Sequence, residues 1–389
     1  AFGTLPGGRA TDNHDAREQP NALLEAGGNL VDTADVYADG SAEKILGRLL
    51  SEDHRRDNVI VATKSVSRPG TERRFDASRR HMLAALDGSL RRLGVDYIDI
   101  WQLHAWDPWT PIEETLSAVD SAIAAGKVRY AGVSNYAGWQ VAQAATMQAQ
   151  SDLANRLVSV QVEYSLVQRG VEREVIPASQ ALGLGVLPWS PLGRGTLTGK
   201  YRNGTPAESR AANPPFSSFV QPYLGDGSRR VVDAVCTAAQ GLDAQPLEVA
   251  IAWVRDQPGV TAPILGARTA AQLKVALGSE QLELPDALRS ALDDVSKPER
   301  GYPEYGWNQR RGDVWPDSRI WTHQGSHGCN GRPVRSRCRA RQPAKRPARC
   351  SQSSRNTATG SSHDCGSTAM ADAGRSYDAA RCASRRTPE

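Results

Sequence analysis

Short apolar runs alternate with longer amphipathic runs along most of this 389-residue chain, and this alternation constrains the fold more than any other feature. Several of the short runs are almost wholly apolar, as strands buried on both faces of a sheet should be. The longer runs have helical periodicity, so the alternation predicts a parallel sheet with right-handed helical crossovers. Strands are expected at 29–33, 59–63, 97–103, 128–133, 157–163, 184–189 and 260–265.

Helices are expected at 42–50, 78–93, 112–125, 139–150, 173–181 and 247–255, with Gly94, Gly126 and Gly183 placed where helices should stop. An eighth strand is expected near residues 2–5, before the first helix. Eight such strands close a (β/α)8 TIM barrel, which we predict for residues 1–309. An open doubly wound sheet is the alternative, but no G-x-G-x-x-G motif follows a strand.

Two segments depart from this regular pattern. Pro20 lies inside the first expected helix and would remove one backbone hydrogen bond there. Residues 193–226 are rich in Gly, Pro and Ser, and we expect a long structureless loop. Such loops usually act as lids or mobile segments.

Composition divides the chain near residue 309. Residues 310–389 carry 16 Lys and Arg against 6 Asp and Glu, and large apolar residues almost vanish from about residue 325. We predict a disordered, low-complexity basic tail, because it cannot bury enough apolar surface to fold. Residues 1–309 carry 31 basic and 37 acidic residues, so the body gives no electrostatic reason to expect binding to nucleic acid or membranes.

Cysteine is equally uneven, since Cys236 alone lies before residue 310. A body nearly free of cysteine suits a reducing compartment, so we expect a cytoplasmic protein. No apolar stretch approaches the roughly 18 residues of a membrane helix, and the first residues lack the pattern of a signal peptide. No metal site is expected, because the histidines and cysteines near Cys329 include no CxxC pair.

Four polar residues follow the ends of three consecutive expected strands, in the texts NLVDTADVY, VIVATK and YIDIWQLH. Carboxyl ends of barrel strands converge on one face, so Asp32, Tyr37, Lys64 and His104 should meet there. Lys64 would stabilise the phenolate of Tyr37, whose ordinary pKa is about 10, and Asp32 would keep Lys64 charged and oriented. His104 would donate a hydrogen bond to a carbonyl oxygen. Each residue alone has an ordinary structural explanation, but their combination indicates a catalytic site.

An acidic tyrosine without a nucleophile suits carbonyl reduction, in which hydride reaches carbon while a proton reaches oxygen. No side chain supplies hydride, so a nicotinamide cofactor is expected. Polar residues at later strand ends could bind its carboxamide. These are Ser134 and Asn135 in GVSN and Gln161 in VQVEYS.

The next strand end offers groups for the rest of a dinucleotide. Trp189 in LPWSPLGRG could stack on the nicotinamide ring, and the backbone N–H groups of Ser190 to Gly193 could face phosphate. Arg268 opens a later helix, where a guanidinium suits the 2′-phosphate of NADP. The alternative for Arg268 is an ordinary surface charge.

These motifs together resemble the aldo-keto reductase superfamily, particularly its bacterial branch related to potassium-channel β-subunits. They occur in family order over roughly residues 2–309 as DTADVY, ATK, QLH, GKVRYAGVSN, QVEYS, PWSPLGRGTLTGKY and ILGARTAAQL. The resemblance implies a (β/α)8 barrel and NADPH-dependent interconversion of carbonyls and alcohols, with Tyr37 as general acid. Positions that match the family's cofactor contacts are Ser134, Asn135, Gln161, Trp189, Ser190, Leu192, Gly193, Lys200, Arg210, Gly266, Arg268 and Gln272.

The chain also departs from the family pattern. Val275 and Ala276 stand where an acidic residue and an asparagine often contact the adenine side, and the opening β-hairpin is expected to be missing. Trp106, Trp109 and Tyr136 are expected to line an aromatic substrate pocket, whereas Trp101, in mid-strand, is expected to pack in the barrel.

Three hypotheses follow. The first is an active NADPH-dependent reductase of a small-molecule carbonyl substrate. The second is an NADP(H)-binding regulatory protein with little turnover, like the channel-associated relatives. The third is a poorly folding product, because a lost strand would leave an open sheet edge.

Overall fold

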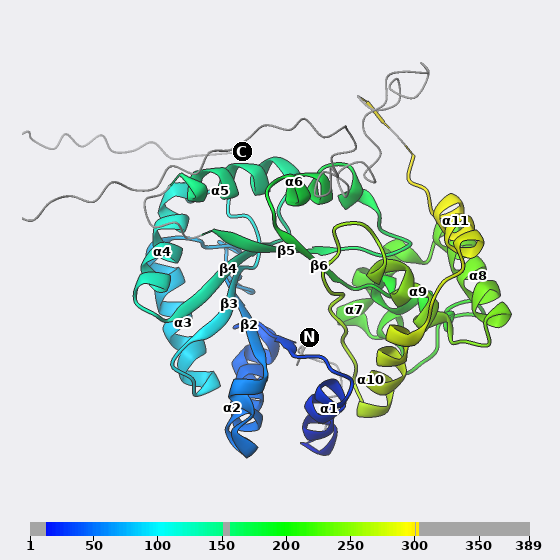
Figure 1. The fold of residues 1–389 in the computed structure, drawn as a ribbon, viewed down its shortest axis with the longest axis horizontal. Coiled ribbons are helices and arrows are strands. Elements are labelled where there is room, and N and C mark those ends of the chain that lie inside the picture. Colours follow the sequence, from blue (N-terminus) through cyan, green and yellow to red (C-terminus); the bar gives the residue numbers. More distant parts are fainter. Residues whose placement is uncertain (1–12, 151–155, 300, 303–389) are drawn as a thin grey trace, which may run out of the picture. The chain divides into compact units, whose positions relative to one another are not determined.

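Six parallel strands form one sheet in the described part of the chain, which comprises residues 13–150, 156–299 and 301–302 of a computed structural model. The strands follow one another across the sheet in chain order, and the sheet curls into a half-barrel (Figure 1). This arrangement confirms the predicted α/β class and is consistent with a TIM barrel. The strands are β1 (Leu30–Asp32), β2 (Ile60–Ser65), β3 (Ile98–Leu103), β4 (Val128–Ser134), β5 (Leu157–Glu163) and β6 (Gly185–Trp189).

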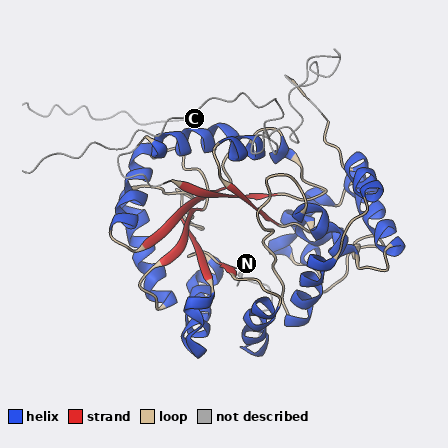
Figure 2. Cartoon of the chain, viewed as in Figure 1, coloured by secondary structure: helices blue, strands red, loops and turns tan. Residues whose placement is uncertain are grey.

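Helices connect the strands and surround the curled sheet on its outer side (Figure 2). The α-helices are α1 (Asn13–Glu25), α2 (Ser41–Ser51), α3 (Arg79–Leu93), α4 (Ile112–Ala124), α5 (Gly138–Ala149), α6 (Val175–Ala181), α7 (Pro214–Val220), α8 (Asp226–Gly241), α9 (Pro246–Arg255), α10 (Ala270–Leu277) and α11 (Asp286–Val295). Short 3₁₀ helices are η1 (Tyr37–Gly40), η2 (Glu52–Asn58), η3 (Gly170–Glu172), η4 (Gly193–Thr198), η5 (Arg210–Ala212), η6 (Gln221–Tyr223) and η7 (Gly278–Gln281).

The expected helix ends are confirmed. α3 ends at Gly94, which adopts a φ of 64° that glycine tolerates, and Gly126 and Gly183 each have a φ of 72° just after α4 and α6. α1 continues through Pro20, which lies inside it as expected. Each of these three helices, α3, α4 and α6, therefore ends just before the glycine that the sequence predicted as its end.

The strand expected at 260–265 is not formed. This segment meets β6 only through two isolated parallel bridges, Val186 with Val260 and Trp189 with Ile264. Pro263 lies between the two bridges and lacks the N–H that a continuous ladder requires. The eighth strand expected near residues 2–5 and the tail at 310–389 lie outside the described residues, so the division at residue 309 stays a prediction.

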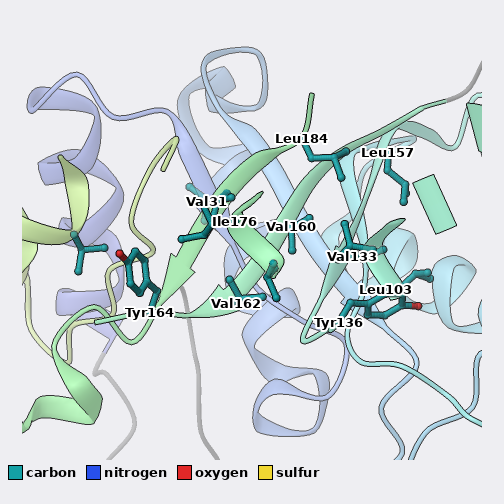
Figure 3. Packing of buried hydrophobic residues seen from close by; sticks show 14 of the residues in the cluster. Val31, Leu103, Val133, Tyr136, Leu157, Val160, Val162, Tyr164, Ile176 and Leu184 are labelled. Carbon is teal, nitrogen blue, oxygen red and sulfur yellow. The ribbon is translucent and has the colours of Figure 1, made fainter. Parts of the chain in front are cut away.

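The core lies between the sheet and the helices that cover it. Leu103 of β3, Val133 of β4 and Val160 of β5 are almost fully buried, and Figure 3 shows them among the side chains of this layer. Trp101 is 1% exposed and its indole N–H donates to the Ser65 hydroxyl at 2.9 Å, so the expectation that it packs is confirmed. Because side chains alternate along a strand, the residues between these core positions point into the curl.

The segment 193–226 is not the structureless loop that its composition predicted. It contains η4, η5, α7 and η6, and a run of turns at residues 199–209 joins η4 to η5. Prolines at 214 and 215 begin α7, where a missing N–H removes no helical hydrogen bond. The abundance of Gly and Pro therefore marks helix starts and tight turns in this segment.

Candidate active site

The four predicted catalytic residues lie together at one edge of the sheet. Asp32 ends β1, Lys64 lies one residue before the end of β2, and His104 follows β3. Tyr37 begins η1, a few residues after Asp32. The strands are parallel, so their carboxyl ends reach the same edge of the half-barrel (Figure 1). This geometry brings the residues together, while their catalytic roles stay predictions.

Lys64 and Asp32 form a buried ion pair. The Lys64 Nζ donates to Asp32 Oδ2 at 2.7 Å and to the Thr33 carbonyl at 2.8 Å, and the two charged side chains are 1% and 2% exposed. Burial disfavours both charges, but the attraction of the partner outweighs it. The pKa of Asp32 is therefore lowered and the pKa of Lys64 is raised. Both groups stay charged near neutral pH.

Two buried amides complete the surroundings of Asp32. Its Oδ1 accepts hydrogen bonds from Gln161 Nε2 at 2.8 Å and from Gln102 Nε2 at 3.2 Å. Gln102 was missed in the sequence, although it lies in QLH and pairs with Lys64 in the β2–β3 register. Gln161, which we predicted to bind the cofactor, directs its amide N–H to Asp32 in this structure. These bonds satisfy the carboxylate and fix it against Lys64.

Tyr37 lies between the ion pair and His104. The Lys64 Nζ is 5.1 Å from the centre of the Tyr37 ring, and the ring packs edge-on against the His104 ring at 5.8 Å between centroids. Burial raises the pKa of Tyr37 above its ordinary value, while the charge of Lys64 opposes the increase. The phenol is therefore protonated at neutral pH, as a proton donor must be, and a cation stands beside the phenolate that would result.

His104 is held as a neutral imidazole. Burial and the nearby charge of Lys64 lower its pKa to about 3. Its backbone is fixed, because its N–H donates to the Ser65 carbonyl and its carbonyl accepts from Asn135 Nδ2, both at 2.9 Å. Its Nδ1 is buried without a hydrogen-bond partner among the described residues. A neutral ring can donate one hydrogen bond to a substrate oxygen without being charged.

Asn135 links the end of β4 to the end of β6. Its Oδ1 accepts from Trp189 Nε1 at 2.9 Å, and its Nδ2 lies 3.1 Å from the Ser134 hydroxyl. Asn135 has a φ of 58°, a left-handed conformation that asparagine tolerates better than most residues. Three predicted cofactor residues, Ser134, Asn135 and Trp189, therefore form one connected group.

A tight turn follows Trp189. Ser190 and Gly193 have φ angles of 53° and 54°, and the Gly193 N–H donates to the Ser190 carbonyl at 2.9 Å. The N–H of Gly193 is thus used within the turn and is not offered to a phosphate as we expected. Leu192, within this turn, is partly buried and packs against the hydrophobic core.

Three cations gather without a carboxylate partner in the described part of the chain. They are Lys200, Arg210 at the start of η5 and Arg268 just before α10. Burial lowers the pKa of Lys200 and of Arg210, and the neighbouring positive charges lower them further. Gln272 accepts the Arg268 backbone N–H at 3.1 Å. A cluster of cations without carboxylate partners creates a positive potential that attracts anions.

Aromatic rings form one wall beside His104. Trp106 packs edge-on against Tyr136 at 5.2 Å and against Trp139 at 5.4 Å. Tyr136 is buried, Trp139 is 58% exposed and Trp109 is 78% exposed. Trp139 was missed in the sequence, because it was assigned to a helix rather than to the strand-end loop. It lies in the first turn of α5, which faces the same edge.

Asp35 is a titratable group close to this site that the sequence did not reveal. Its Oδ1 is buried without a hydrogen-bond partner among the described residues, while its backbone N–H donates to the Lys64 carbonyl at 3.1 Å. Burial and the fully buried carboxylate of Glu43 raise the pKa of Asp35 to about 7, although Arg92 and Lys64 oppose the shift.

The Asp35→Asn variant is expected to be more stable than the parent at pH 8 and nearly equal to it at pH 4. The folded pKa lies above the unfolded value, so the folded state holds more protons and stability falls as pH rises between the two. The partly exposed side chain limits the difference to roughly 1–2 kcal/mol. Urea unfolding across pH measures it. The control is Asp39→Asn on the same turn, and parallel pH profiles for Asp35→Asn and the parent would refute the assignment.

The described residues contain no group of three His, Cys, Asp or Glu side chains that could hold a metal ion. None of their helices combines the length and the apolar character needed to cross a bilayer. The cysteines and histidines near Cys329 lie outside the described residues.

The curled parallel sheet, with Asp32, Tyr37, Lys64 and His104 at its carboxyl edge, is the architecture of an α/β protein of the TIM-barrel class. The profile of the Aldo/keto reductase family matches residues 1–297. The chain belongs to this family.

Its relatives include both enzymes and channel subunits by name. The chain is 36% identical over 263 residues to a probable voltage-gated potassium channel subunit beta of Oryza sativa, covering 67% of this chain and 80% of the relative. It is 34% identical over 318 residues to the uncharacterized oxidoreductase YrpG of Bacillus subtilis, covering 79% and 95%. It is also 34% identical over 325 residues to the protein tas of Escherichia coli, covering 76% and 92%.

Proposed function

We propose that this chain reduces a small aldehyde or ketone to an alcohol with NADPH, in the cytoplasm, and that Tyr37 donates the proton. The observation that carries the proposal is the buried Lys64–Asp32 pair, with the Lys64 Nζ 5.1 Å from the Tyr37 ring. A phenol beside a permanently charged ammonium can release a proton and leave a stabilised phenolate.

The residues present fit a phosphorylated dinucleotide. Lys200, Arg210 and Arg268 lack carboxylate partners among the described residues, and, besides burial, the charge of Arg268 lowers the pKa of both Lys200 and Arg210, so a bound anion would relieve the repulsion between them. These cations would hold phosphate, while Ser134, Asn135 and Trp189 would bind the nicotinamide end. When bound, the reduced nicotinamide supplies hydride to the carbonyl carbon.

The side chains of the chain supply the proton and the orientation. His104, neutral because its pKa is about 3, donates a hydrogen bond that orients the carbonyl oxygen beside Tyr37. Tyr37 transfers its hydroxyl proton to that oxygen as negative charge develops there. Lys64 stabilises the phenolate, Asp32 holds Lys64, and water then restores the proton. The apolar wall of Trp106, Tyr136 and Trp139 would bind the body of the substrate, with Trp109 as a further predicted contact.

A second candidate is an NADP(H)-binding regulatory subunit with little turnover. The relative in rice that is named a probable channel subunit beta favours it. Turnover separates the two candidates. We expect the purified chain to consume NADPH in a one-to-one ratio with alcohol formed from an activated aldehyde. Tight NADPH binding without alcohol from any aldehyde or ketone tested would refute the reductase and support the regulatory subunit.

We expect the Arg268→Ala variant to bind NADPH about 10–100-fold more weakly, because it loses a charge-assisted contact to the 2′-phosphate. Affinity for NADH, which lacks that phosphate, should change less than twofold by the same argument. Fluorescence titration with both cofactors measures the difference. Lys274→Met, an exposed cation on α10, is the control. Equal losses for NADPH and NADH would contradict a 2′-phosphate contact.

A further inference from the structure

Arg194, near the start of the segment 193–226, forms both hydrogen bonds and ring contacts with distant residues. Its Nε and Nη2 donate to both carboxylate oxygens of Glu163, at 2.7 and 2.6 Å. Its Nη1 donates to the Phe219 carbonyl at 2.5 Å. The Arg194 and Glu163 side chains are only 15% and 13% exposed. A two-bond pair of this kind, shielded from water, fixes both distance and angle.

Three aromatic rings surround the same guanidinium. Its central carbon lies 3.8 Å from the Phe219 ring centre, 5.0 Å from that of Tyr223 and 5.8 Å from that of Trp189. Arg194 adopts a φ of 57°, which is unfavourable for arginine and is maintained only where surrounding contacts require it. The contacts of one side chain therefore hold a strained backbone position at the start of the segment.

These contacts join places that are distant in the sequence. Glu163 ends β5 and pairs in register with Trp189 at the end of β6. Phe219 and Tyr223 lie near the far end of the segment, in α7 and η6. Arg194 thus connects the beginning of the segment 193–226 to its end. Through Glu163 it also connects the segment to the end of β5, beside the candidate nicotinamide site. Lys200 and Arg210 lie on the chain between the two connected ends of the segment.

The charge of Arg194 distinguishes it from the other cations of the site. Glu163 neutralises Arg194, whereas Lys200, Arg210 and Arg268 have no carboxylate partner among the described residues. Arg194 is therefore not free to bind a phosphate. Its contacts suit a positioning role, in which it holds the segment that carries cations meant for an anion.

We propose that the Arg194–Glu163 pair is a clasp that preorders the segment 193–226 for NADPH, and that it sets cofactor affinity without touching the cofactor. The proposal rests on the proposed function for its ligand. With the clasp closed, Lys200 and Arg210 are ordered before the cofactor arrives. With the clasp open, part of the binding free energy is spent on ordering the segment, so affinity falls.

The central test compares Glu163→Gln with Asp233→Asn. Each change turns a carboxylate into an amide of the same shape, but Asp233 pairs with Arg202 at 2.7 Å on the surface, with side chains 48% and 43% exposed. We expect Glu163→Gln to raise the Kd for NADPH about tenfold, and Asp233→Asn to change it less than twofold. The KM for NADPH should rise with it, while kcat at saturating NADPH stays within about twofold.

Limited trypsin digestion without cofactor tests the clasp independently of the proposed function. We expect faster cleavage after Lys200 or Arg210 in Glu163→Gln than in the parent or Asp233→Asn. If NADPH binds the parent, saturating NADPH should restore protection. If NADPH does not bind the parent, the proposed function fails while this comparison still tests the clasp. Unchanged cleavage, or a Kd equal to the parent value, would overturn the inference.

Arg194→Met and Arg194→Lys separate positioning from general folding. The lysine retains the charge but not the two parallel hydrogen bonds, so its Kd for NADPH should lie between those of the parent and the methionine variant. If Arg194→Met does not fold, Arg194→Lys alone tests the clasp. It should have a higher Kd for NADPH than the parent and a melting temperature near that of the parent. A lysine variant with the parent Kd would contradict the clasp.

Discussion

The Tyr37→Phe variant is expected to lose about 10²- to 10⁴-fold in kcat for carbonyl reduction, the usual contribution of a general acid. The ring and its edge-on contact with His104 remain, so the pocket should keep its shape. Only the proton donor is removed. Affinity for NADPH should stay within about twofold, because the hydroxyl is required when charge develops on the substrate oxygen and not for binding.

Steady-state kinetics and cofactor titration on the same preparations test this expectation. Tyr130→Phe is the matched control, because it makes the same change on β4 at a ring that is 57% exposed. The control should retain the parent rate. If Tyr37→Phe and Tyr130→Phe turned over equally, Tyr37 would not be the proton donor.

The Lys64→Met variant is expected to lose roughly 3–5 kcal/mol of stability at pH 7, because it leaves the Asp32 carboxylate buried without a countercharge. The Lys127→Met variant should lose less than about 1 kcal/mol, because Lys127 and Asp87 are 44% and 46% exposed. Both ion pairs have nearly the same length, 2.7 and 2.8 Å. Burial is therefore the variable that this comparison isolates.

The pH dependence of stability that arises from Asp32 should have opposite signs in the parent and in Lys64→Met. In the parent, the pKa of Asp32 is lowered, so its contribution to stability is present above the unfolded value of 3.8 and is lost as pH falls through the folded pKa. In Lys64→Met, burial without the ammonium should raise that pKa, so stability should increase as pH is lowered from 7 toward 5.

The double variant Asp32→Asn, Lys64→Met should recover part of the lost stability, since no unpaired charge remains. Urea unfolding of the parent and the single and double variants measures these differences. A Lys64→Met variant as stable as the parent at every pH would show that the pair is not buried in solution.

The sequence predicted the elements that repeat a pattern. Strands β1 to β6 follow almost wholly apolar runs, and the helices between them follow amphipathic runs. The predicted strand at 260–265 did not form, because Pro263 interrupts the ladder although Val260, Thr261 and Ile264 are β-branched. The segment 193–226 was misjudged for the opposite reason, since its prolines begin helical turns. A composition rich in Gly and Pro does not distinguish an irregular loop from a series of helix starts and tight turns.

In the site, the polar residues at strand ends could be predicted from the sequence. The residues that act through contacts with neighbouring side chains could not. Asp32, Lys64 and His104 follow directly from parallel strands that end at one edge. Gln102 was missed, because a buried amide acquires its role only from the carboxylate it contacts. Asp35 was missed for a related reason, since its unusual pKa results from burial near Glu43.

The sequence alone determined the order of the strands and which end of each carries polar chemistry, because both follow from local periodicity and from the geometry of parallel crossovers. Only the tertiary structure decided which charges are neutralised. Arg194 has Glu163, while Lys200 and Arg210 have no carboxylate partner among the described residues. Such pairing depends on distances of a few ångströms between segments far apart in the chain, and local sequence carries no record of those distances.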